Sequence, residues 1–141
     1  MTKDIKLTVK GVQRDDTGNQ DSTEITVSGE YYFRNGSHYI FYEETDGDSG
    51  EHVKNSLKIK GNLLELNRKG MVNSRMVFET GKRHAMDYAT PYGVLRMETV
   101  TSRILFSEGA EDIGILLEYE LWMEETLVSV CELTLKLECR Q

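Results

Sequence analysis

The 141-residue chain has no apolar run that approaches the roughly 20 residues of a membrane-spanning helix. Proline is almost missing, with Pro91 the only one, and cysteine occurs twice, as Cys131 and Cys139. If both cysteines lie on one strand, their Cα atoms are about 27 Å apart. A disulfide allows no more than about 7 Å. These scarcities argue against a helical membrane protein and a disulfide scaffold, and we expect reduced, buried or half-buried thiols.

Motifs for metal binding and nucleophilic catalysis are also missing. His38, His52 and His84 do not have the spacing of zinc ligands, and the chain contains no Cys-x-x-Cys. There is no Gly-x-Ser-x-Gly and no phosphate-binding glycine loop before a helix. The acidic stretch 46–51 resembles only the start of a calcium loop and lacks its later glycine and glutamate. We therefore expect no metal and no cofactor.

What the chain has instead is an alternation of apolar and polar residues along most of its length. It is clearest over residues 113–123 and 127–139, where the odd positions are mostly apolar. Successive side chains of a strand point to opposite faces, so this pattern predicts a long hairpin with one buried face. Residues 5–12 and 24–34 alternate in the same way, and Asn35-Gly36 is a strong hairpin-turn signal.

No segment predicts a helix of three turns, and tight turns separate nine or ten short strands. This pattern is typical of an all-β antiparallel meander. Closing a meander into a barrel removes its exposed edges, so we predict a single β-barrel domain over residues 1–141 with about 8–10 strands. A two-sheet sandwich is the alternative. We expect the long strand 94–106 to bend near residues 98–102.

The net charge of −7 is spread unevenly along the chain. Residues 1–51 carry 5 positive and 11 negative side chains, and residues 107–141 carry 2 and 9. The central residues 52–84 carry 8 positive and 2 negative side chains. A basic centre between acidic ends suits an anion-binding face, one half of a self-complementary contact, or a solvated sheet face.

Two stretches combine the side chains that orient a polar ligand group. His84, Tyr88 and Thr90 share one strand face. Thr99, Thr101 and Arg103 are expected on the same strand face as the apolar residues that precede them. Such groups deep in an apolar barrel can hold a carboxylate or phosphate. The alternative is that the Tyr and Thr side chains only form hydrogen bonds that stabilise the sheet, and that Arg103 pairs with a carboxylate. A bend in the strand would turn Arg103 toward water. The predicted ligand-binding residues are Tyr31, His84, Tyr88, Thr99, Thr101 and Arg103.

Three functions remain open on these residues. The first is a non-enzymatic, cytoplasmic binding module for a small amphipathic or anionic molecule in the barrel interior. The second is a structural or protein-interaction module with a filled barrel, with a homodimer as one form. The third is an enzyme that uses His84 with Asp87 or Tyr88, although Asp87 lies on the opposite strand face. We expect no membrane partner. We also expect no nucleic acid, because acidic residues flank the aromatic hairpin 31–42.

The chain resembles the YwiB-like family of small, uncharacterised bacterial proteins. The residues that carry the resemblance are 88–93, Met97, the strand 99–103, the hairpin segments 114–122 and 128–137, and the early strand 25–29. The resemblance implies a barrel similar to the calycins, the lipocalin and fatty-acid-binding barrels. It implies no established activity, ligand or catalytic residue. The Gly-x-Trp of true lipocalins is missing near the first strand, since the single tryptophan is Trp122.

Overall fold

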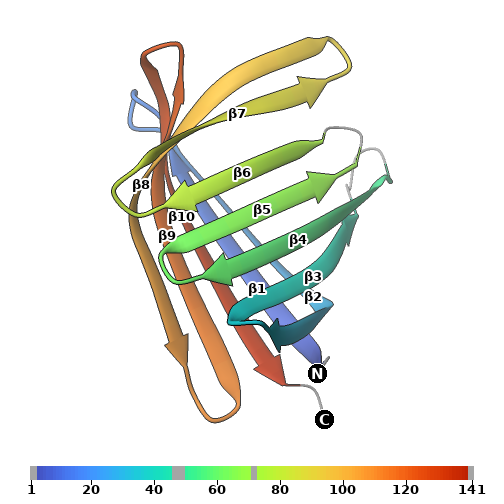
Figure 1. Cartoon of the computed structure of the whole chain (residues 1–141). Helices are drawn as coiled ribbons and strands as arrows, with labels where there is room; N and C mark the ends of the chain where they lie inside the picture. Colours follow the sequence, from blue (N-terminus) through green and yellow to red (C-terminus); the bar gives the residue numbers. More distant parts are fainter. Residues whose placement is uncertain (1–2, 46–49, 71–72, 140–141) are drawn as a thin grey trace.

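The computed structural model describes residues 3–45, 50–70 and 73–139, apart from the side chains of residues 3 and 88–90. These residues form strands, turns and short loops, and no helix (Figure 1). The strands are β1 (Lys3–Arg14), β2 (Gln20–Arg34), β3 (Ser37–Thr45), β4 (His52–Lys60), β5 (Leu63–Lys69), β6 (Ser74–Glu79), β7 (Arg83–Thr90), β8 (Gly93–Glu108), β9 (Asp112–Met123) and β10 (Thr126–Cys139).

The ten strands form one antiparallel sheet that curls into a nearly closed barrel. Its order is β6-β5-β4-β3-β2-β1-β10-β9-β8-β7, so every neighbour in space is a neighbour in sequence except β1 and β10. That pair joins the two ends of the chain, with Leu7 opposite Leu137 and Val9 opposite Leu135. The predicted meander barrel is confirmed, and the place where it stays open lies in the middle of the chain, between β6 and β7 (Figure 1).

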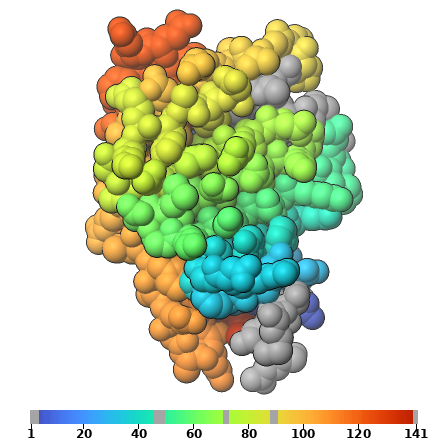
Figure 2. Space-filling view, viewed as in Figure 1, coloured from blue at the N-terminus to red at the C-terminus, as the bar shows by residue number. Residues whose placement is uncertain are grey.

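A few hydrogen bonds join the two sides of the seam near the turn between β6 and β7. One isolated parallel bridge joins Thr80 to Thr101, and the Gly81 backbone nitrogen donates to the Thr101 carbonyl at 2.9 Å. In the space-filling view the side chains of β7 rest against those of β6 at the left of the seam (Figure 2). β6 and β7 are thus joined by local contacts near their turn rather than by a continuous ladder.

We call the end that holds both termini the lower end, and the end with the 124–125 turn the upper end (Figure 1). The apolar core fills the lower and middle interior. Its side chains come from nearly every strand, as the alternation predicts. Burial of this apolar surface is the main stabilising term of the fold. The largest fully buried side chains are Leu7, Ile40, Leu57, Ile59, Leu64, Phe78, Ile115, Leu117 and Leu135.

Two local predictions are confirmed and one is wrong. The strand β8 shifts its register between Thr101 and Arg103, where we expected the bend. Both cysteines are free thiols, and Cys131 is buried as expected, but Cys139 is exposed because it lies at the last position of β10. Residues 46–49 of the acidic stretch 46–51, which was compared above with a calcium loop, lie outside the described residues.

Candidate functional site

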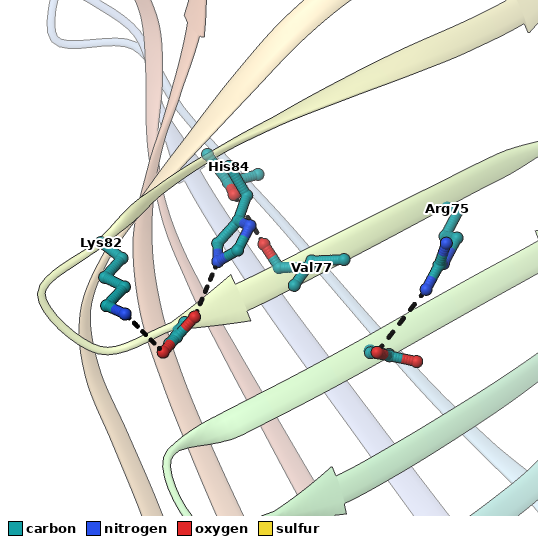
Figure 3. Close-up of polar contacts among 7 residues, drawn as sticks. Arg75, Val77, Lys82 and His84 are labelled. Atoms are coloured by element: carbon teal, nitrogen blue, oxygen red, sulfur yellow. Dashed lines mark hydrogen bonds and ion pairs between the residues drawn. The ribbon is translucent and has the colours of Figure 1, made fainter.

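The predicted site residue His84 lies at the seam between β6 and β7 (Figure 3), and Thr99 lies opposite His84 on the neighbouring strand β8. His84 Nε2 is 2.9 Å from Glu79 Oε1, and Lys82 Nζ is 3.3 Å from Glu79 Oε2. These two partners hold the pKa of the Glu79 carboxyl below its usual range, with the hydrogen bond to His84 as the largest cause. The Thr99 hydroxyl donates to the Val77 carbonyl at 2.8 Å. Both predicted residues therefore tie β6 to the β7–β8 hairpin.

Thr101 and Arg103 point in different directions. Thr101 is buried, and its hydroxyl oxygen has no partner among the described residues. The register shift of β8 after Thr101 turns Arg103 to the outside, where its Nη1 is 3.8 Å from Glu118 Oε1. With a side chain that is 54% exposed, Arg103 cannot reach the interior. Arg103 therefore pairs with a carboxylate on the outer face, which was the alternative expected from the sequence.

Tyr31 lies at the lower end, far along the barrel from the seam residues. Its hydroxyl and His38 Nδ1 are hydrogen-bonded at 2.7 Å, and the His38 ring packs on Phe106 with centroids 4.3 Å apart. Partial burial raises the pKa of Tyr31 and lowers that of His38, and the charge of Glu108 adds to the first shift and opposes the second. The side chain of Tyr88 is outside the described residues. The five predicted residues whose side chains are described therefore do not converge on one pocket.

The interior cavity lies elsewhere, in the upper half of the barrel. It has a volume of about 400 Å³, which falls within the usual range for small-molecule sites. Apolar side chains from five strands form much of its wall: Val9, Ile25, Leu66, Met76 and Leu133. The packed core lies below it. The protein is therefore neither a filled barrel nor a hollow one, but a barrel filled in its lower part.

A polar cluster of Glu44, Asn55 and Arg68 projects into this cavity. Asn55 Nδ2 donates to Glu44 Oε1 at 3.0 Å, and Arg68 Nη2 is 3.7 Å from the same oxygen. Asn55 is 3% exposed, and its Oδ1 has no hydrogen-bond partner among the described residues. Buried polar atoms of folded proteins are nearly always partnered, so this oxygen is an exception that disfavours the folded state.

Two tyrosines and a thiol, Tyr42, Tyr119 and Cys131, also line the cavity. Burial raises the pKa of Tyr42 far above its usual value, and its hydrogen bond to Glu44 adds to the shift. Burial likewise raises the pKa of Tyr119, with a further contribution from the hydrogen-bonded Cys131. Both phenols therefore stay neutral at physiological pH and act as hydrogen-bonding groups rather than as anions.

The sequence contains a signal for this cluster, although the predicted site residues did not include it. Glu44, Asn55 and Arg68 each continue the inward parity of a strand whose other members are buried apolar residues, such as Ile40, Leu57 and Leu66. A charged or amide side chain in phase with a buried stripe points inward unless the strand bends. Read in register, the three strand ends predict polar groups at one end of the barrel.

A second hollow lies on the outer face of β2–β5. It has a volume of about 810 Å³ and is lined by outward residues that include Ser28, Phe41, Lys54 and Asn67. Tyr42 and Asn55 border both this groove and the interior cavity. The groove carries acidic side chains at β2 and β3 and lysines at β4 and β5, and none of its lysines forms an ion pair shorter than 4.0 Å among the described residues.

No metal centre is visible in the described part of the chain. Residues 3–45, 50–70 and 73–139 contain no group of three histidine, cysteine or acidic side chains that could hold a metal ion. They also contain no helix that is long and apolar enough to cross a membrane.

The fold and the cavity define a class of small, single-sheet β-barrel proteins. A family model for a domain of unknown function, DUF1934, matches residues 7–135, and the chain belongs to this family.

Two comparisons place the chain within that family more closely. It is 32% identical over 117 residues to the uncharacterized β-barrel protein YwiB of Bacillus subtilis, which covers 83% of this chain and 80% of YwiB. The crystal structure of the Bacillus subtilis ywiB protein superposes with a TM-score of 0.87 at 28% identity, over 99% of this chain and 94% of that one. The resemblance expected from the sequence is confirmed, whereas a relation to the calycins stays a prediction.

Proposed function

We propose that this β-barrel protein is a non-enzymatic binding module that holds one small amphipathic molecule in its upper cavity. The observation that carries the proposal is the cavity of about 400 Å³, which combines an apolar wall with the hydrogen-bonded polar cluster of Glu44, Asn55 and Arg68. A fold that only needed to be stable would gain by filling such a space with apolar side chains.

Of the two ligand types expected from the sequence, the charges favour the amphipathic one. The inward positions around the cavity carry one cation, Arg68, and two acidic residues, Asp21 and Glu44. A ligand that is only an anion therefore meets more like charges than opposite ones. A molecule with an apolar body and a mixed polar head suits both the charges and the wall.

A binding role also agrees with the distribution of acid and base groups. The hydrogen-bonded His84–Glu79 pair lies at the seam, and His38 lies at the lower end, so no described histidine lines the upper cavity. Its two tyrosines have raised pKa values and are poor bases at neutral pH.

The proposal is tested with N-phenyl-1-naphthylamine, a small neutral dye whose fluorescence rises in apolar sites. We expect one dye per barrel, and at least tenfold weaker binding to Met76→Trp, in which an indole fills the cavity. Leu105→Trp adds the same indole at an exposed position of β8 and should leave binding unchanged. Native mass spectrometry counts the dye and detects any molecule that co-purifies. An absence of dye binding, or equal affinity in Met76→Trp, overturns the proposal.

A second candidate function, protein interaction, rests on the β7–β8 hairpin. Near its tip, Val94 is 66% exposed and Leu95 is 46% exposed, on a hairpin that projects from the upper end (Figure 1). Exposed neighbouring apolar side chains are a feature of interaction sites. The same native mass spectra report whether a homodimer forms, and Val94→Lys should then dissociate it. A monomer at every concentration removes this candidate.

A further inference from the structure

The two neighbours of β2 pair with it over different lengths. On one side β1 pairs with residues 20–31 of β2, whereas on the other side β3 pairs only with residues 29–34. Beyond Gly29, β2 continues beside β1, while β3 continues beside β4 (Figure 1). Residues 20–27 therefore form a free edge of β2, along which no described strand pairs with them on the side away from β1.

The ladder between β1 and β2 shows which main-chain groups face this free edge. At its turn the Asp15 nitrogen donates to the Asn19 carbonyl at 3.0 Å. Hydrogen-bonded pairs alternate along an antiparallel ladder with a continuous register, so the odd-numbered residues of β2 bond to β1 here. The N–H and C=O groups of Ser22, Glu24 and Thr26 thus point to the free edge, where no described residue bonds to them.

Open space borders the free edge on both faces of the sheet. On the inner face, Asp21, Thr23 and Ile25 line the cavity of about 400 Å³. On the outer face, the groove of about 810 Å³ begins beside the free edge at Val27. Alternate side chains of a strand point to opposite faces, so a strand added here has room for its side chains on both.

The free edge favours an extended chain that is not a second copy of this protein. An extended chain carries N–H and C=O groups at the spacing that Ser22, Glu24 and Thr26 present. Antiparallel pairing of two free edges in full register places Glu24 opposite Glu24 of the other copy, and like charges in that position are destabilising. Lys10 lies opposite Glu24 on β1 but forms no ion pair with it. A basic residue opposite Glu24 is therefore favoured on the incoming chain.

We propose that the free edge of β2 binds an extended peptide segment of another protein, which adds to β2 as an antiparallel strand. A basic residue of the peptide lies opposite Glu24 on the outer face. The two residues that flank it are apolar and face inward beside Thr23 and Ile25. Main-chain hydrogen bonds supply the affinity, and the basic and apolar side chains supply the selectivity. Dye binding in the cavity is not needed for this partner, so the docking site and the proposed function stand or fall separately.

Amide hydrogen exchange, measured by NMR on the intact protein, tests the main-chain pairing. The probe is the peptide acetyl-Thr-Ser-Val-Lys-Val-Ser-Thr-amide. At saturation it should slow exchange of the Ser22, Glu24 and Thr26 amides at least tenfold. The amides of Thr23 and Ile25, which already bond to β1, should be unchanged. The same peptide with a methyl group on the lysine main-chain nitrogen cannot pair and should have no effect.

Three results of this experiment overturn the proposal. The first is unchanged exchange at all three amides when the peptide is added. The second is equal slowing by the methylated peptide, which would mean that charge rather than strand pairing causes the effect. The third is slowing that grows with protein concentration in the absence of peptide, which would assign the free edge to a second copy of this protein.

Variants of Thr26 test the edge itself. Thr26→Pro removes an N–H that does not bond to β1, so the fold should persist while peptide binding weakens at least tenfold. Thr26→Val loses the same hydroxyl but keeps the N–H, and it should bind like the wild type. Unchanged binding to Thr26→Pro overturns the proposal. If Thr26→Pro does not fold, the methylated peptide decides whether main-chain pairing occurs.

A charge reversal tests the basic residue of the peptide. The wild type should bind the lysine peptide about fivefold more tightly than the same peptide with glutamate in place of lysine. Glu24→Lys should reverse this preference. Glu132→Lys makes the same charge change at an exposed position of β10 and should keep the wild-type preference. A preference that Glu24→Lys leaves unchanged, or that Glu132→Lys reverses, overturns the proposal.

Discussion

The lower and upper halves of the barrel interior are built by the same strands but from different residues. In the lower half, inward positions are aliphatic or aromatic and fully buried, as Leu7, Leu64 and Leu135 show. In the upper half, the same inward stripes continue as Glu44, Asn55 and Arg68 and enclose a cavity. The difference indicates that the lower half stabilises the fold, while the upper half is less tightly packed and holds polar side chains.

The two ends also differ in their turns. At the lower end, Asn35 and Gly36 have φ angles of 53° and 78°, which both residue types tolerate. At the upper end, Glu124 and Glu125 take φ angles of 46° and 64° in the same two-residue turn, where glutamate is strained. Strained residues often lie near functional sites, and these two glutamates lie at the upper end.

The largest expected effect is on the free energy of unfolding, when a large side chain is shortened in each half of the interior. Leu117→Ala in the packed interior should lower the free energy of unfolding by about 2–5 kcal/mol. Met76→Ala in the cavity wall should lower it by less than about 2 kcal/mol, because Met76 is only half-buried and already borders empty space. Urea denaturation measures both values. Equal losses would mean that the upper half contributes as much to stability as the lower half.

Replacing either of two nearby threonines of β8 should have a smaller effect on stability, with opposite signs for the two positions. Thr99 and Thr101 are both 1% exposed, but only the Thr99 hydroxyl has a partner among the described residues. Thr99→Val removes the bond to the Val77 carbonyl and should destabilise the protein by about 1 kcal/mol. Thr101→Val removes an unpartnered hydroxyl and should stabilise it by about 1 kcal/mol. Thermal and urea denaturation of the pair checks the signs. Destabilisation by Thr101→Val would reveal a water partner.

Replacement of the strained upper turn should have a similar or smaller effect. Glu124→Asn with Glu125→Gly supplies the residue types of the lower turn and should raise the free energy of unfolding by about 0.5–1 kcal/mol. The reciprocal change, Asn35→Glu with Gly36→Glu, is the matched control and should be destabilising. A lack of response to both double variants would contradict the view that the two turns carry different strain.

The barrel was predictable from the sequence because the patterns that specify its strands and hairpins are local. Period-two alternation sets which side chains face inward, and Asn35-Gly36 sets a hairpin, so the strands and their pairing along the chain follow. The pairing of β1 with β10 and the open seam between β6 and β7 were not predictable in this way. Both depend on how ten strands close on one another, and no short stretch of sequence carries that information.

The candidate site was predicted less well, for two physical reasons. Thr99 and Thr101 are in the interior as their parity indicates, but the register shift that follows them turns Arg103 outward. A bulge moves every later side chain to the other face, so one residue of irregularity displaces a predicted site. The cation that lines the cavity is Arg68, which sits at the end of a short strand where the apolar pattern is weakest.

The smallest expected effect concerns the lower end, where His38 is enclosed by Tyr31 and the rings of Phe33 and Phe106. Burial lowers the pKa of His38 in the folded protein below its unfolded value of about 6.5, although the Glu108 charge opposes the shift. The folded state thus favours neutral His38, so this contribution to stability is complete above pH 6.5 and is lost as the pH falls through the folded pKa.

Thermal unfolding between about pH 7.5 and pH 5 should therefore show a decline that is shallower in His38→Gln, which cannot gain a proton. His52→Gln, at an exposed position at the start of β4, is the matched control and should keep the wild-type decline. If His38→Gln and the wild type decline equally, the lower end is not a proton-sensitive part of the core. The two halves then differ only in packing, and the pH dependence of the protein arises elsewhere.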